Sequence, residues 1–229
     1  MATSGTYTFN LDITEIMEEA YDLCGLSMSS GGDYNTAKRA LDLIFLEWQN
    51  KGLNLWKVEQ GSITLVAGAN LYDADASALE IVDVVLRTDS GDTDKQFDQR
   101  LNRISRTEYI HQAKKLMQSK PTQFYVDKGI TLKIGVWATP DSAQTYTIIY
   151  DYIKRIEDSG TNASLNTDVP ARYLPCLTYA LAYNIACKNN ESQPRVPMIK
   201  ARYDELWKEV SEADRERAPV RFVPNMNNY

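Results

Sequence analysis

The spacing of apolar residues changes twice along this chain, and that change constrains the fold more than any other feature. From Ile13 to Cys24, and again from Ala37 to Trp48, apolar residues recur every three or four positions, which is typical of amphipathic helices. Between residues 56 and 165 they tend to alternate with polar residues, as in half-buried strands. After Asp168 the helical spacing returns. The order helices, strands, helices predicts an α+β fold.

The amino-terminal helices carry start and stop signals. Asp12 and Glu15 have the spacing of a capping box, and Gly25 follows the apolar run as a stop signal. We expect Asp33 to cap the second helix and Gly52 to end it. The short connection between the two runs predicts a pair of antiparallel helices.

The middle of the chain is expected to form strands with one helical interruption. Candidate strands are residues 62–66, 79–87, 96–105, 123–126, 130–137 and 145–153. Asp127-Lys128-Gly129 predicts a tight hairpin with a positive φ at the glycine. Ser105 and Glu108 form a second capping box, which predicts a helix that includes Met117 and ends before Pro121. In the last strand, alternate residues are expected to share one face: Tyr146, Ile148, Tyr150 and Tyr152.

Helical spacing in the carboxyl-terminal part predicts two further helices. Pro170 is a start signal for the first, which should have a distorted or restarted first turn at Pro175. The last helix should end at Ala218-Pro219, because proline cannot continue it. The residues that follow have no period and contain a second proline, so we expect an extended tail.

Each predicted helical pair has a single strong apolar stripe, so the two ends of the chain need one another to bury it. We therefore expect a four-helix unit formed by residues 1–55 and 166–215. Residues 56–165 are then an inserted antiparallel β-rich domain, and residues 216–229 are an extended C-terminal tail.

Charge is distributed unevenly along the 229 residues, whose formal net charge is -6. Residues 95–133 hold nine Lys or Arg against three Asp or Glu. The first helix, in contrast, carries only carboxylates: Asp12, Glu15, Glu18, Glu19 and Asp22. This pattern favours different neighbours for the two regions, with two ordinary solvent faces as the alternative.

Composition excludes several classes of protein. Eleven Gly, eight Pro and an odd number of cysteines do not fit collagen, a disordered chain or a disulfide scaffold. No stretch approaches the ~20 apolar residues of a membrane span, and the amino terminus lacks the pattern of a signal peptide. We expect a protein that is made in the cytoplasm and is not inserted in a membrane.

Residues that usually carry chemistry are scarce. His111 is the single histidine, which excludes a two-histidine metal site, and we expect it to be a surface or packing residue. Cys24, Cys176 and Cys187 lack metal-ligand spacing and fall on apolar helix faces, so we expect all three in the core. No glycine-rich phosphate loop is present. We predict no catalytic residue, no cofactor and no bound metal.

Composition alone leaves two other functions possible. The many carboxylates would allow the acid and base of a cell-wall hydrolase, whose separation a sequence does not show. A DNA-binding module would use the basic segment, with a stacking platform made of Tyr109, Tyr125, Arg100, Arg103 and Arg106. The isoelectric point near 5.0 argues against a dedicated nucleic-acid binder, and ordinary strand aromatics are the alternative interpretation.

Two terminal blocks of sequence carry a family resemblance. The first is the capped helix from Asp12 to Gly25 with the following helix, which ends in EWQNKGLNLW at residues 47–56. The second is DVPARYLP at residues 168–175, together with the alanine-rich helix that follows and the terminal DRERAP. Both blocks resemble those of head-to-tail adaptor proteins of short-tailed bacteriophages. The central strands are similar to the β-domain inserted in larger members of that family.

The resemblance implies a structural virion protein rather than an enzyme. Copies of such adaptors assemble as a ring, usually twelve-fold, beneath the portal protein, and the ring connects the portal to the tail nozzle protein. Genomic DNA passes through the channel of the ring without sequence-specific binding. The expected location is therefore the neck of the virion, after assembly in the host cytoplasm. A tail-tube or nozzle subunit is the alternative within the virion.

The same resemblance implies that the carboxyl-terminal segment grips the portal. The candidate portal-binding residues are Arg217, Val220, Arg221, Phe222 and Val223. The arginines would form charge-assisted hydrogen bonds, and the phenylalanine would be the apolar anchor. The acidic first helix is a candidate wall of the channel, where carboxylates would repel DNA, and the outer wall of the ring is the alternative position.

Overall fold

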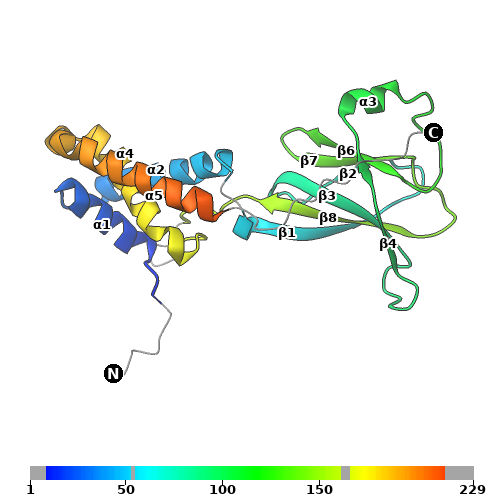
Figure 1. Cartoon of the computed structure of the whole chain (residues 1–229), viewed down its shortest axis with the longest axis horizontal. Helices are drawn as coiled ribbons and strands as arrows, with labels where there is room; N and C mark the ends of the chain where they lie inside the picture. Colours follow the sequence, from blue (N-terminus) through cyan, green and yellow to red (C-terminus); the bar gives the residue numbers. More distant parts are fainter. Residues whose placement is uncertain (1–8, 53–54, 161–165, 215–229) are drawn as a thin grey trace. The chain divides into compact units, whose positions relative to one another are not determined.

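The computed structural model describes residues 9–52, 55–160 and 166–214 (Figure 1). Contacts divide the chain into two compact units. Unit 1 combines the described residues before Trp56 with those from Glu157 onward, and unit 2 is Trp56–Ile156. Helices dominate unit 1 and two sheets form unit 2. The α+β class predicted from the sequence is confirmed.

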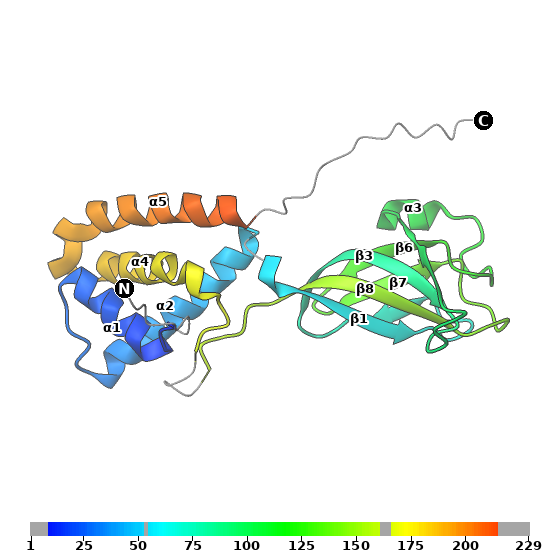
Figure 2. The same cartoon turned by 60° about the horizontal axis from the view of Figure 1, so that its bottom comes forward.

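Helix α4 (Leu174–Lys188) lies at the centre of unit 1 and contacts the other three long helices (Figure 2). These are α1 (Ile13–Cys24), α2 (Gly31–Asn50) and α5 (Val196–Ala213). Short 3-10 helices precede α4 and α5, namely η2 (Ala171–Tyr173) and η3 (Asn190–Arg195). Because α4 is covered on several sides, apolar residues surround most of its axis rather than forming one stripe.

The caps of α1 and α2 follow from their first residues. The Asp12 carboxylate accepts the Glu15 backbone N–H at 2.8 Å, while the Glu15 carboxylate accepts that of Asp12 at 3.0 Å, which confirms the predicted capping box. Gly25 ends α1 in the left-handed conformation, with φ 72°. Asp33, predicted as the cap of α2, is instead its third residue, and the cap is Ser30. The prediction was wrong because the Ser30 hydroxyl oxygen accepts a hydrogen bond from the Asp33 N–H. The helix therefore begins at Gly31, and its first turn contains two glycines.

The start of α4 confirms one prediction, and the end of α5 corrects another. The chain makes the 3-10 turn η2 and restarts as an α-helix at Leu174, which leaves Pro175 in the first turn. α5 ends at Ala213, five residues before the predicted stop at Ala218. Asp214 leaves the helical conformation with ψ 35°, and its carboxylate accepts a hydrogen bond from the Tyr173 hydroxyl at 3.1 Å.

Unit 2 consists of two four-stranded sheets. The first has the order β1 (Val58–Thr64), β8 (Tyr146–Lys154), β3 (Ala78–Thr88) and β4 (Phe97–Arg100). The second has the order β2 (Leu71–Asp73), β7 (Leu132–Trp137), β6 (Gln123–Lys128) and β5 (Asn102–Arg103). The three-residue strand β2 was absent from the expected set because it is too short to show a period.

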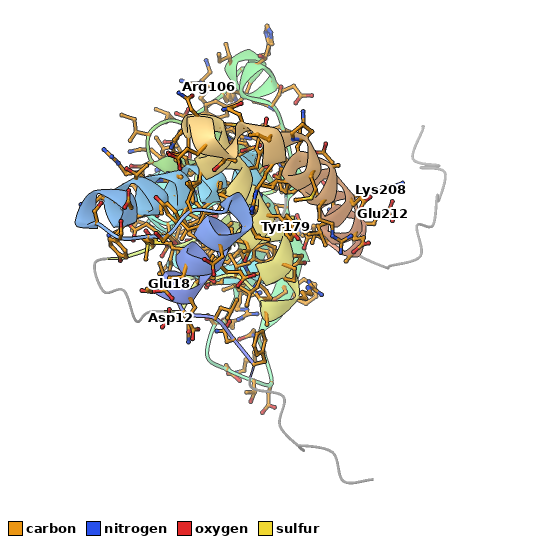
Figure 3. All side chains as sticks on the ribbon, turned by 90° about the vertical axis from the view of Figure 1, so that its left-hand side faces the viewer. Asp12, Glu18, Arg106, Tyr179, Lys208 and Glu212 are labelled. Atoms are coloured by element: carbon orange, nitrogen blue, oxygen red, sulfur yellow. The ribbon has the colours of Figure 1, made fainter. Side chains whose placement is uncertain are left out.

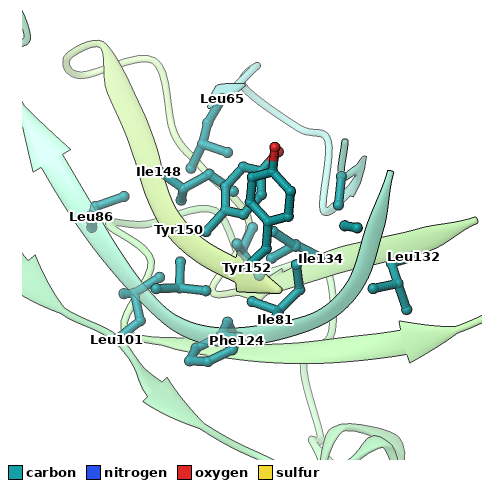
Figure 4. Packing of buried hydrophobic residues seen from close by; sticks show 14 of the residues in the cluster. Leu65, Ile81, Leu86, Leu101, Phe124, Leu132, Ile134, Ile148, Tyr150 and Tyr152 are labelled. Carbon is teal, nitrogen blue, oxygen red and sulfur yellow. The ribbon is translucent and has the colours of Figure 1, made fainter. Parts of the chain in front are cut away.

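Both sheets contribute to one hydrophobic core (Figure 4). The predicted face of β8 is confirmed, since Tyr146, Ile148, Tyr150 and Tyr152 all belong to the core. Phe124 and Ile134 enter it from the second sheet and are fully buried. Unit 2 therefore encloses a core drawn from its own strands.

The expected strand 96–105 is divided between the two sheets. β4 pairs with β3 in the first sheet, and β5 pairs with β6 in the second. The chain crosses over at Leu101, which is buried, and its N–H donates to the Val84 carbonyl. The β5–β6 pair is parallel, so the expectation of an entirely antiparallel domain was wrong at this corner.

Two local expectations in unit 2 were also wrong. Helix α3 is Arg106–His111 and does not reach Met117, because it buries none of its residues and so gains little tertiary burial to stabilise a longer helix. The hairpin between β6 and β7 forms where predicted, with Lys128 opposite Leu132. Gly129, however, does not take a positive φ, since this longer loop closes without it.

Candidate functional site

The carboxylates of α1 line one wall of a groove between α1 and α4. The groove has a volume of about 700 Å³. Its apolar surface comes from both helices and from the chain before α1, with Leu11, Leu23, Leu174, Pro175 and Tyr179. Its acidic wall consists of Glu15, Glu18, Glu19 and Asp22. Figure 3 shows Glu18 on α1 and Tyr179 on α4 at the two sides.

The acidic wall is electrostatically unfavourable in the isolated chain. Glu15 and Glu19, and likewise Glu18 and Asp22, are four residues apart, and like charges at this spacing destabilise a helix by about 0.2–0.5 kcal/mol per pair. The capping box between Asp12 and Glu15 offsets part of this repulsion. The Arg195 guanidinium donates to the Leu23 carbonyl at the carboxyl end of α1, at 3.1 Å. α1 contains no basic residue. A cationic partner at the groove would relieve the repulsion.

The residue at which the carboxyl-terminal segment begins is held firmly. Asp214 is 8% exposed, and Tyr173, which donates to its carboxylate, is fully buried. The Arg172 guanidinium donates to the Tyr173 hydroxyl and lies over its ring, 4.6 Å from the centroid. Burial raises the pKa of the Tyr173 hydroxyl, so this group stays protonated as a donor. The predicted portal-binding residues, Arg217, Val220, Arg221, Phe222 and Val223, lie outside the described residues.

The tyrosines and arginines of the basic segment do not form an open platform. Tyr109 and Tyr125 stack on each other, with centroids 4.3 Å apart. Arg106 pairs with Asp127 at 2.6 Å. The two remaining arginines also have carboxylate partners: Arg100 pairs with Asp83 and Arg103 with Glu80. Because each guanidinium is already paired, the segment offers less positive charge to phosphate than its sequence indicates.

The histidine and the cysteines occupy ordinary positions. His111 is exposed, which selects the surface position of the two that were expected. Cys24 and Cys176 are buried, but Cys187 is exposed, so its assignment to the core was wrong. It lies in the last turn of α4. No group of three potential metal ligands occurs in the described ranges, and no helix there is long and apolar enough to cross a membrane.

Comparison with known families identifies the family of the chain. The model of the SU10 adaptor protein family matches residues 13–223. The chain belongs to the SU10 adaptor family. No curated protein matched the sequence. The resemblance to phage head-to-tail adaptors is thereby confirmed, and the chain is a structural adaptor protein of a phage.

The family match covers both units of this SU10 adaptor. It begins at Ile13, the first residue of α1, and continues to Val223. All five candidate portal-binding residues therefore fall within it, whereas the last six residues fall outside. Sequence reasoning found the acidic side of α1 but missed the apolar side of the groove. Leu174 and Tyr179 belong to the first helix predicted in the carboxyl-terminal part, and no local pattern marks them as groove residues.

Proposed function

We propose that this SU10 adaptor forms a ring beneath the portal protein, with twelve copies, and connects the portal to the tail nozzle. In this proposal the helices of unit 1 form a four-helix body, and the residues after Asp214 form an extended tail that binds the portal. Genomic DNA passes through the ring without sequence-specific contacts. Adaptor and portal then meet in the neck of the virion.

One observation carries the proposal. A match to an adaptor family extends nine residues beyond the firmly held Asp214 and ends at Val223. The nine residues include three arginines and one phenylalanine among small apolar residues. Such a segment suits a partner surface with acidic groups and an apolar pocket. If the carboxyl-terminal segment becomes ordered when it binds, a few residues can cover a large area of the portal surface.

The ion-paired arginines of unit 2 support the channel part of the proposal. Their charges are compensated by neighbouring carboxylates, so DNA would meet a surface to which it does not adhere strongly. If the protein binds DNA with an affinity that falls steeply as the salt concentration rises, the channel part of the proposal is wrong.

Removing residues 216–229 tests the tail. We expect the truncated chain to keep the circular dichroism spectrum of the full chain and to lose portal binding in a pull-down with purified portal rings. Undiminished binding would remove the tail from the mechanism. If the full chain binds nozzle protein but not portal, the alternative of a nozzle subunit is favoured.

Point variants make the test sharper. Replacing Arg217, Arg221 and Phe222 with alanine should weaken portal binding by about a hundredfold or more, because anchors of this kind contribute at least 2 kcal/mol when buried. The matched control replaces Asn225, Asn227 and Asn228, which lie beyond the family match. Equal losses in the two variants would argue for a nonspecific effect of the tail.

A further inference from the structure

Helix α2 presents an apolar ridge on the side opposite its buried face. Leu43 is 63% exposed and Leu46 is 55% exposed. Arg39 is also exposed, four residues before Leu43, so the three side chains follow one another along the helix. We call Arg39, Leu43 and Leu46 the α2 ridge. Two large apolar side chains in succession are unusual on a helix face that meets only water.

Arg39 is the charged residue of the α2 ridge, and two carboxylates, Asp42 and Glu47, flank it. The Asp42 carboxylate accepts the Ser159 backbone N–H at 2.8 Å. Glu47 pairs with Lys51 at 2.6 Å. The Arg39 guanidinium donates from Nε to the Asn35 carbonyl of its own helix at 3.2 Å, which leaves its charge uncompensated by this contact. Glu47 is thus neutralised by Lys51, Asp42 keeps its charge although it is hydrogen-bonded, and the exposed Arg39 has no carboxylate among its contacts in the described part of the chain.

The groove between α1 and α4 has complementary properties. Its apolar surface includes Leu174 and Tyr179, and the carboxylates of its acidic wall repel one another in the isolated chain. A ridge of side chains on one helix packs into a groove between residues of others, which is the usual geometry of helix contacts. Arg39 has the charge that would compensate the acidic wall.

Ridge and groove lie on different sides of unit 1. In the end-on view of Figure 3, α2 extends to one side of α1, and Tyr179 of α4 lies on the other side. One copy therefore does not fill its own groove with its own ridge. Contact between ridge and groove of two copies uses different surfaces on each partner, and such heterologous contacts close into rings when the rotation permits.

We propose that neighbouring subunits of the ring meet by seating the α2 ridge of one copy in the α1–α4 groove of the next. The inference rests on the ring assembly proposed above and names the two surfaces that would form it. It places the carboxylates of α1 at the subunit contact, where Glu18 and Glu19 face Arg39 of the neighbouring copy. If the tests below fail, these carboxylates face the channel or the outer wall of the ring instead.

Charge exchange tests the electrostatic part. Arg39→Glu alone should lower the number of copies held per portal ring, with assembly weakened by about tenfold or more. Combining it with Glu18→Arg and Glu19→Arg in the same chain should restore assembly. Lys200→Glu, on the exposed side of α5, is the matched control. Failure of the combined variant to recover, or an equal effect of Lys200→Glu, would overturn the proposal.

Crosslinking tests the contact itself. In a Cys187→Ser background, four variants carry one cysteine at Leu43 or Leu46 and one at Glu18 or Tyr179. A short thiol-specific crosslinker applied to portal-bound adaptor should give a ladder of covalent oligomers for at least one pair. The corresponding single-cysteine variants should stay monomeric, because the cysteine of one copy then meets no thiol on the next. No ladder from any of the four pairs would overturn the proposal.

The two proposals fail in distinguishable ways. If the native chain does not saturate a portal ring, the proposed function fails. If it does, and neither charge exchange nor crosslinking has the expected effect, only the ridge-and-groove contact fails. A further variant combines Tyr179→Cys with Val220→Cys in the same background. If this variant gives the ladder and the α2 pairs do not, the tail fills the groove, and the inference is also overturned.

Discussion

Tyrosine rings cover glycines at two places in unit 2. Gly61 lies directly opposite Tyr150 in the β1–β8 pair, and Gly135 lies directly opposite Tyr125 in the β6–β7 pair. A Cβ at either glycine would overlap the ring of its partner. Neither glycine has a positive φ, so the requirement comes from the close approach of the ring rather than from the backbone. Each pair shields a stretch of backbone that glycine alone would leave open.

Gly135→Ala tests this pairing. We expect a loss of about 1–3 kcal/mol in the free energy of unfolding, because the ring of Tyr125 must move away from a packed position. Urea denaturation followed by tyrosine fluorescence gives the value. Gly129→Ala is the matched control, since its Cβ would meet only the Thr131 carbonyl at 3.5 Å. Equal losses in the two variants would contradict the role of the ring.

Burial also separates the three thiols. It raises the pKa of Cys24 to about 11 and the pKa of Cys176 to about 12, so neither is a thiolate at neutral pH. Cys187 is exposed. In the native protein at pH 7.5, we expect one thiol to react with a chromogenic disulfide reagent. All three should react in denaturant, and Cys187→Ser should abolish the fast reaction. Rapid labelling of two or three thiols in the native protein would contradict this.

At the scale of the element, the capping box of α2 links stability to pH. The Ser30 hydroxyl donates to the Asp33 carboxylate at 2.8 Å and lowers the pKa of Asp33, with further help from the backbone N–H groups of Ser30 and Ser29. The folded state therefore binds this proton less readily than the unfolded state. The stabilisation is present above the unfolded pKa of about 3.9 and is lost as the pH falls through the lower folded value.

Asp33→Asn should therefore lower the free energy of unfolding at pH 7 by more than it does at low pH. The difference from the native chain should shrink as the pH falls below about 4. Denaturant titrations at several pH values measure it. Asp204→Asn, a substitution of an exposed carboxylate within α5, serves as the control. A difference that is independent of pH would contradict the assignment of Asp33 to the cap.

On the scale of the whole molecule, the two units keep separate cores. The hydrophobic cluster of unit 2 contains only residues between Leu65 and Tyr152. Unit 2 also begins and ends at neighbouring positions, because Val58 in β1 pairs with Ile153 in β8. Unit 1 joins chain segments that are more than a hundred residues apart, for example through the Ser192 hydroxyl, which donates to the Cys24 carbonyl at 3.0 Å.

Residues 56–156 alone should consequently fold. We expect dispersed amide resonances and a cooperative urea transition for the excised unit, because its core and its closing strand pair are both retained. The full chain should then show a transition at the same urea concentration when observed through tyrosines of unit 2. A collapsed spectrum for the excised unit would show that it depends on unit 1.

Local chemistry was sufficient to predict much of this fold. The Asp12–Glu15 box, the stop at Gly25 and the restart of α4 at Leu174, one residue before Pro175, each depend on residues within one turn of one another, so their signals are visible in sequence order. The alternation along β8 is also local, and its buried face was predicted correctly. The two terminal blocks identified the family for the same reason, since each is a short continuous stretch.

The remaining features depended on contacts between distant residues. The chain passes from one sheet to the other at Leu101 because β3 and β6, its two partner strands, lie in different sheets. Cys187 is exposed although it follows an apolar run in α4. The groove is the clearest case, because Leu23 and Tyr179 lie on helices separated by the whole of unit 2 in the sequence. The sequence by itself determined the elements and the acidic side of α1. Only the tertiary structure brought an apolar surface beside those carboxylates, because that juxtaposition arises when two distant helices pack.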